Sequence, residues 1–145
     1  MLPIYIGADH AGFILKEYLK TRLNDHAYVF EDVGCFSDES VDYPNFAEKV
    51  SVAIQEKKAE LGILVCGSGE GMVIAANKFS GIRAGLAWNT EVAALLKAHN
   101  DAQIICLGSR FTAPDYAWKM VDAFLNAKFE GGNHARRIEL VNHFC

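Results

Sequence analysis

The feature that most constrains the fold is a nearly continuous apolar run, Leu61–Cys66 (LGILVC), followed at once by a glycine-rich turn. Such a run is typical of a strand in a parallel sheet that helices cover on both faces, because neither face of the strand meets water. Further short runs occur at Pro3–Ala8, at Tyr28–Val33 (where charges interrupt it), at Arg83–Trp88 and at Ala102–Leu107. We therefore expect five strands.

Segments with helical spacing separate these strands. The first carries Leu15, Leu19 and Leu23 at the i, i+4 spacing of one helix face. Alternating strands and helices favour βαβ units and a doubly wound parallel sheet. Without a linker or repeat, we expect a single domain over residues 1–145. The other expected helices carry their apolar stripes at Phe46–Ile54, Met72–Phe79, Val92–Leu96, from Pro114 towards Lys128, and at Ile138–Phe144 after a Gly131-Gly132 break.

Several residues are predicted to begin these helices. Asp42 precedes Pro44, which occupies a first-turn position. Thr90 is predicted to cap the helix that follows it, and Thr112 with Asp115 resembles a capping box.

Composition excludes several classes of protein. The net charge of −4 and the lack of a basic run argue against nucleic-acid binding. No apolar stretch reaches the roughly 18–20 residues of a membrane span, and no signal-peptide pattern is visible, so we expect a cytoplasmic protein that binds no membrane. The four cysteines (Cys35, Cys66, Cys106 and Cys145) form no CxxC motif, which argues against a redox pair or a zinc ribbon.

Open parallel sheets bind ligands beyond the carboxyl ends of their strands, which directs attention to the segment Cys66–Gly71. Its three glycines let backbone N–H groups approach an anion, and a cysteine before a helix is favoured as a thiolate. Met72 breaks a dinucleotide-binding fingerprint, and neither a P-loop nor a cysteine-phosphatase loop fits. The alternative is that Cys66 is only a buried core residue before a tight turn.

Other candidates also follow predicted strands or end helices. Asp9 and His10 either face a ligand, or Asp9 caps the following helix and His10 is a solvated turn residue. His99 is either a proton donor in the cleft or an ordinary helix-end histidine. Arg110 and Arg137 suit phosphate binding, although surface charge is the common role of such residues. The five histidines show no metal-ligand spacing and the carboxylates do not cluster, so we expect no metal and no cofactor.

Together the motifs resemble the type B ribose-5-phosphate isomerase family, which includes the galactose-6-phosphate isomerase subunits. Seven ordered motifs spread over essentially the whole chain carry this resemblance. They are GADHAGF (7–13), DYP (42–44), CGSGEGM (66–72), AANKFSGIRA (75–84), HND (99–101), GSR (108–110) and EGGNHARR (130–137).

The resemblance implies a Rossmann-like three-layer α/β/α sandwich that assembles as a homodimer or tetramer. Its C-terminal helix would be a dimerisation arm, and its sites would lie at the subunit interface. The implied reaction interconverts aldose and ketose phosphates without a metal or cofactor.

The resemblance also implies roles for individual residues. Cys66 would be the base that moves a proton between C1 and C2, and His99 of the neighbouring subunit would assist ring opening. Ser68 would hydrogen-bond the substrate within a loop that stabilises the enediolate. Substrate contacts are implied for Asp9, His10, Tyr43, Gly67, Ser68, Gly69, Glu70, Gly71, Asn100, Arg110, Asn133 and Arg137.

Two positions depart from the family pattern. Many members carry arginine where this chain has Asn133, so either Arg136 supplies the missing charge or the phosphate is held less tightly. A branch of the family uses a loop glutamate as base, but that residue aligns with Met72. We therefore keep Cys66 as the base and expect Glu70 to point to solvent.

The predicted function is interconversion of ribose 5-phosphate and ribulose 5-phosphate through an enediolate. The alternatives are isomerisation of galactose 6-phosphate, allose 6-phosphate or a tetrose phosphate, and a non-catalytic phosphosugar-binding module. The presence of both Cys66 and His99 favours an enzyme, because a binding module needs neither.

Overall fold

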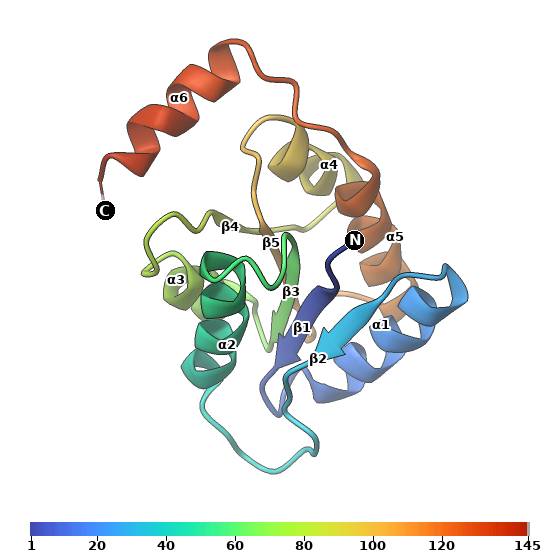
Figure 1. The fold of residues 1–145 in the computed structure, drawn as a ribbon. Coiled ribbons are helices and arrows are strands. Elements are labelled where there is room, and N and C mark those ends of the chain that lie inside the picture. Colours follow the sequence, from blue (N-terminus) through green and yellow to red (C-terminus); the bar gives the residue numbers. More distant parts are fainter. Residues whose placement is uncertain (145) are drawn as a thin grey trace.

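The computed structural model describes residues 1–144 and contains a five-stranded, all-parallel sheet (Figure 1). The strand order is β2-β1-β3-β5-β4. The predicted sheet is confirmed, and four strands lie inside their predicted ranges, while β5 ends one residue later. The strands are β1 (Ile4–Ala8), β2 (Phe30–Asp32), β3 (Gly62–Cys66), β4 (Ala84–Leu86) and β5 (Ile104–Gly108).

Helices cover both faces of the sheet, which gives the expected three layers (Figure 1). On one face lie α1 (Phe13–Asp25), α4 (Thr90–Ala98) and α5 (Pro114–Asn126). On the other lie α2 (Tyr43–Gln55) and α3 (Glu70–Ala76). Two predicted helices were too long, because α3 ends before Phe79 and α5 ends before Lys128.

The position of the central strand β3 between two helical layers explains why its sequence is apolar. Ile63 and Val65 pack into the core under α1 and α5, whereas Leu64 and Cys66 pack under α2 and α3. All four side chains are at most 5% exposed. Because successive residues of a strand point to opposite faces, a strand between two helical layers must be apolar throughout.

The last helix, α6 (Asn133–Asn142), extends away from the sheet and buries no residue (Figure 1). A hydrogen bond from Arg83 Nη1 to Asn142 Oδ1 (3.2 Å) ties its end to the body of the protein. Leu140 and Val141 are about half exposed. Within residues 1–144, no helix is long and apolar enough to cross a membrane.

Two predicted caps are wrong. Asn89, not Thr90, is the N-cap of α4, and its side-chain oxygen accepts a hydrogen bond from the Val92 N–H (2.8 Å). The amide of Asn89 reaches the N–H three residues ahead, which leaves Thr90 as the first helical residue. Ala113 is the N-cap of α5 and no side chain caps that helix, so Thr112 lies one residue too early for a capping box.

The remaining predicted helix start is partly right. Asp42 occupies the N-cap of α2 and a proline stands in the first turn, as expected. The Asp42 carboxylate nevertheless makes no capping hydrogen bond.

A buried ion-pair cluster holds β2 against α1. Lys16 is fully buried, and its Nζ lies 2.6 Å from Asp32 Oδ2 and 2.9 Å from Glu17 Oε2. Lys20 also pairs with Asp32 (2.7 Å). Burial raises the pKa of Asp32, but hydrogen bonds from Lys16 and Lys20 outweigh it and hold the pKa below its usual value. The folded state therefore depends on an ionised Asp32.

Replacing Asp32 by asparagine tests this cluster. Asp32→Asn is expected to lower the free energy of unfolding by about 3 kcal/mol at neutral pH, because it removes a partner of a buried charge. The folded pKa is depressed, so the wild-type advantage is present above the ordinary pKa of 3.8 and is lost as the pH falls through the folded value. Urea denaturation of both proteins between pH 7 and pH 3 measures the difference.

The matched control is Asp25→Asn, which removes an exposed ion pair with Arg22. Exposed ion pairs contribute little to the free energy of unfolding, so Asp25→Asn should leave it nearly unchanged. If both variants lost the same free energy of unfolding, the buried ion pair of Lys16 would be no more stabilising than an exposed one.

Candidate active site

The carboxyl-end edge of the neighbouring strands β1 and β3 is where a sheet of this topology can hold a ligand. The helix that follows β1 covers one face, and the helix that precedes β3 covers the other. The two strands are parallel neighbours, with Ala8 paired to Val65. In such sheets the ligand crevice opens where the connections diverge, outside the carboxyl ends of the strands. Asp9 and Cys66 both lie at this edge.

Cys66 ends β3 with its thiol held in place. The side chain is 5% exposed, and the Gly69 N–H donates a hydrogen bond to Sγ (3.2 Å). The Cys66 carbonyl accepts from the Ser109 N–H (2.9 Å). An N–H donor directed at the sulfur stabilises negative charge there, as a nucleophilic or basic thiolate requires.

The loop after Cys66 requires glycine for steric reasons. Gly69 has a φ of +79°, and a Cβ there would lie 2.5 Å from the Leu86 side chain. A Cβ at Gly67 would lie 3.1 Å from Cζ of Arg110, so the guanidinium packs directly over this backbone. Tyr43 covers the end of the loop, where a Cβ on Gly71 would lie 2.6 Å from its ring.

Two further loop residues differ in their accessibility. The Ser68 hydroxyl is exposed and accepts a hydrogen bond from the Glu70 N–H (3.3 Å). Glu70 is also exposed, as expected, whereas Met72 is fully buried.

The segment after β1 contributes Asp9 and His10. Asp9 is buried, and its Oδ1 accepts a hydrogen bond from the Gly12 N–H (3.0 Å), so it does support the turn that begins α1. His10 Nδ1 accepts from the Val41 N–H (3.2 Å), so a neutral His10 ring carries its proton on Nε2. Gly12 rather than Asp9 is the N-cap of α1, and His10 is half-buried and hydrogen-bonded rather than a solvated turn residue. The ligand-facing role of both side chains stays a prediction.

The surroundings of Cys35 and Cys106 favour the protonated thiol. Burial raises the pKa of Cys106, and the neighbouring Cys66 adds to that effect. Burial also raises the pKa of Cys35, whose thiol donates to the Ser37 carbonyl (3.2 Å). Both stay protonated near neutral pH. Cys145 lies outside the described residues.

A second group of predicted residues lies along a groove of ≈ 450 Å³ between α4 and α6. His99 is the C-cap of α4 and lines this groove with Asn100 and Arg137. Asn133 begins α6 and is exposed. Arg83 holds the turn after His99, because its Nε donates to the Asn100 carbonyl (3.0 Å).

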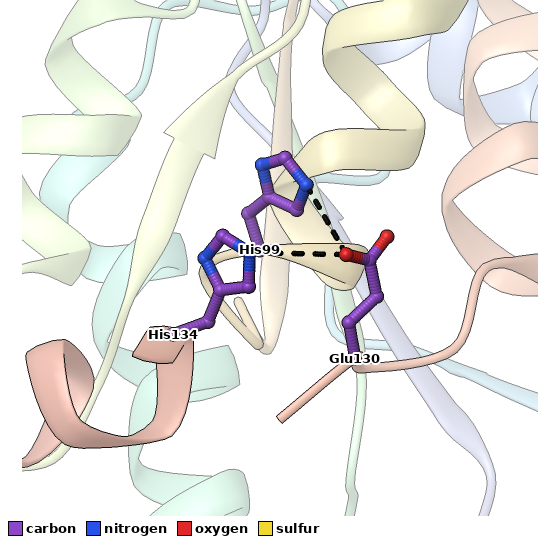
Figure 2. Close-up of side chains that lie close together, drawn as sticks. All are labelled: His99, Glu130 and His134. Atoms are coloured by element: carbon purple, nitrogen blue, oxygen red, sulfur yellow. Dashed lines mark ion pairs between the residues drawn. The ribbon is translucent and has the colours of Figure 1, made fainter. Parts of the chain in front are cut away.

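Sequence reasoning missed two residues beside His99. Figure 2 shows Glu130 and His134 next to it: Glu130 Oε1 lies 3.5 Å from His99 Nε2 and 3.7 Å from His134 Nε2. The two imidazole rings stack at 4.1 Å. The i, i+4 spacing of Glu130 and His134 was visible in the sequence, but only the fold brings His99 to them.

The predicted site residues thus form two groups on one chain. Within residues 1–144, no hydrogen bond or ion pair joins one group to the other. The first group contains Asp9, His10, Tyr43, Cys66, Gly67, Ser68, Gly69, Glu70, Gly71 and Arg110, and the second contains His99, Asn100, Asn133 and Arg137.

Known proteins resemble this chain over nearly its whole length. Ribose-5-phosphate isomerase B of Escherichia coli (strain K12) is 41% identical over 141 residues, which cover 97% of this chain and 95% of the relative. The structure of ribose-5-phosphate isomerase B from Clostridium thermocellum has a TM-score of 0.97 and 41% identity, covering 99% of this chain and 97% of that one.

A third relative carries a bound sugar phosphate. The structure of ribose-5-phosphate isomerase B from Mycoplasma genitalium with bound ribulose-5-phosphate has a TM-score of 0.93 and 39% identity, covering 99% of this chain and 95% of that one. The family model described as Ribose/Galactose Isomerase matches residues 4–141. The chain belongs to the Ribose/Galactose Isomerase family.

Proposed function

We propose that residues 1–145 form a single-domain aldose–ketose isomerase that interconverts ribose 5-phosphate and ribulose 5-phosphate. The observation that carries this proposal is the position of Cys66. Its thiol lies at the carboxyl-end edge of β1 and β3, where sheets of this topology bind ligands, and it accepts a hydrogen bond from the glycine loop. Relatives about 40% identical are named for this reaction, and one binds ribulose-5-phosphate. Because its substrate is a phosphorylated metabolite, we place the enzyme in the cytoplasm.

The chemistry follows from the loop geometry. In the open-chain aldose, the Cys66 thiolate removes the proton from C2, and the electron pair moves into the C1–C2 bond while negative charge develops on O1. A proton then passes from O2 to O1, the electron pair left on O2 forms the C2 carbonyl, and the C1–C2 double bond takes the proton back from the thiol at C1, which yields the ketose and restores the thiolate. Fixed backbone N–H donors stabilise such an oxyanion without reorganising, and the loop Gly67–Gly71 presents its backbone beside the thiol.

Ring opening needs a second group, which we assign to His99. An imidazole can pass a proton between the ring oxygen and the anomeric hydroxyl. His99 lies in the groove between α4 and α6 rather than beside Cys66. We therefore propose that it acts on the substrate held by the Cys66 loop of a neighbouring subunit. Asn100 would contact the sugar from the same side.

Two copies of the chain would supply each other with the missing half of the site. The exposed apolar residues Leu140 and Val141 on α6 are suited to an interface, because a projecting amphipathic helix needs a partner. We propose a homodimer, or a tetramer built from dimers. Contacts from Asp9, His10, Tyr43, Ser68 and Arg110 would come from one subunit.

Arg137 is proposed to bind the phosphate. It lines the groove beside His99, whereas Arg136 does not. Guanidinium groups suit phosphate because they form paired, charge-assisted hydrogen bonds. Because Asn133 stands where many family members have an arginine, Arg137 would neutralise a larger share of the phosphate charge.

Replacing Cys66 tests the base. Cys66→Ala is expected to lower kcat about 10²–10⁴-fold, which is what a positioned base contributes. Assays with five- and six-carbon sugar phosphates measure this effect and the substrate preference together. The control is Cys35→Ala, since this thiol is buried and protonated. Turnover by Cys66→Ala close to that of the control, with both proteins folded, would exclude Cys66 as the base.

Mixing two inactive variants tests the shared site. Cys66→Ala and His99→Ala are each expected to be nearly inactive. When their subunits exchange at random, half of the dimers are mixed and each mixed dimer has one intact site, so about a quarter of the wild-type activity should return. If both residues acted within one subunit, no activity would return.

Replacing Arg137 tests phosphate binding. Arg137→Ala is expected to raise KM about tenfold with little change in kcat, because a hydrogen bond to a charged group contributes roughly 1.5–3 kcal/mol. Arg136→Ala is the matched control, with the same loss of charge on the same helix. Equal KM values for the two variants would remove Arg137 from the phosphate site.

A further inference from the structure

His99, Glu130 and His134 form a three-residue group whose donor atoms converge. Among residues 1–144 this is the one group of three histidine, cysteine or acidic side chains with ligand atoms within 4.8 Å of one another. Figure 2 shows both imidazoles directed at the same carboxylate oxygen. Glu130 forms ion pairs with these two histidines and with no lysine or arginine of the described chain. No permanently charged side chain among the described residues therefore neutralises the Glu130 carboxylate, and beside neutral imidazoles it remains available to a cation.

The distances suit a tetrahedral metal ion. Zinc bonds of about 2.0–2.1 Å at tetrahedral angles place neighbouring ligand atoms about 3.4 Å apart. The two imidazole–carboxylate distances are 3.5 and 3.7 Å, so two edges of the tetrahedron are almost formed. The third edge lies within 4.8 Å, so closing it needs a shift of at most about 1.4 Å. The stacked rings must tilt to direct both lone pairs at one ion.

The backbone holds the group together while leaving it accessible. The Glu130 N–H donates to the Ala98 carbonyl (3.0 Å), which fixes this segment beside the end of α4. The His134 N–H donates to the Gly131 carbonyl (3.1 Å) in the first turn of α6. The exposed side-chain fractions of His99, His134 and Glu130 are 38%, 28% and 56%. In the single chain an ion can therefore reach the group, and the rings have room to rotate.

We propose that His99, Glu130 and His134 form an inhibitory site for a zinc-class divalent transition-metal ion. Two imidazoles and one carboxylate are a donor set that zinc uses when it keeps a fourth position open for water. Imidazole nitrogen disfavours Mg²⁺ and Ca²⁺, which prefer oxygen ligands. Binding would occupy Nε2 of His99 and so block ring opening. The inhibitory half of this proposal rests on the proposed function.

Matched charge variants test the site. Glu130→Gln removes a ligand, and Glu139→Gln removes the same charge from an exposed position on α6. Equilibrium dialysis with ZnCl₂ should show one ion per chain for wild type and Glu139→Gln. For Glu130→Gln the affinity should fall at least about tenfold, since loss even of an outer-sphere partner costs 10–100-fold. Co²⁺ should give the visible absorption of a tetrahedral site in the first two proteins only.

Isomerase assays connect binding to inhibition. Each protein is first assayed in EDTA, where wild type should be fully active, and is then titrated with ZnCl₂ or MgCl₂. The zinc concentration for half-inhibition should rise at least about tenfold in Glu130→Gln but not in Glu139→Gln, and MgCl₂ should not inhibit. Equal zinc inhibition of all three proteins would place the ion elsewhere, for example on Cys66, and overturn the proposal.

The two proposals can fail separately. If wild type lacked isomerase activity, the dialysis and Co²⁺ spectra would still report on the metal site. If Glu130→Gln bound zinc as tightly as wild type, the metal site would be wrong while the isomerase assignment stood.

Discussion

The burial of β3 between two helical layers is the constraint on which the rest of the structure depends. Its side chains alternate between the two cores, so every position must be apolar. The strand ends where the helical layers diverge. Its last residue, Cys66, still packs in the core, and the chain then enters the glycine loop. The position of the proposed base is thus a consequence of how the core is built.

Close packing of three loops then fixes the geometry around that thiol. Gly12 packs against the backbone of Val65, and a Cβ on Gly108 would lie 2.6 Å from the Ser68 carbonyl oxygen. The Ser109 hydroxyl donates to the Ala11 carbonyl (2.7 Å), which joins the loops after β1 and β5. Backbone donors held this tightly are already oriented before a charge develops, which is the condition for efficient stabilisation of an oxyanion.

The sequence predicted what depends on local pattern and missed what depends on tertiary contact. Strands such as Leu61–Cys66 were found because burial on both faces leaves a continuous apolar run. Local sequence does not distinguish Thr90 from the neighbouring Asn89, the actual N-cap of α4, because both side chains are suited to capping. The fully buried Lys16 falls on an apolar helix face, and nothing local shows that Asp32 and Lys20 complete its charge cluster. Glu130 and His134 join His99 only through the fold.

The proposed division of the active site between two subunits would account for the projection of α6 from the body of the protein. A helix packed on the sheet would bury its apolar side but could not carry Arg137 and His134 outward beside His99. Projection leaves Leu140 and Val141 exposed, a cost that only association removes. In the shared site that we propose, this arrangement would favour pairing of two chains. Assembly and phosphate binding would then depend on α6, while proton transfer stays with the rigid sheet edge.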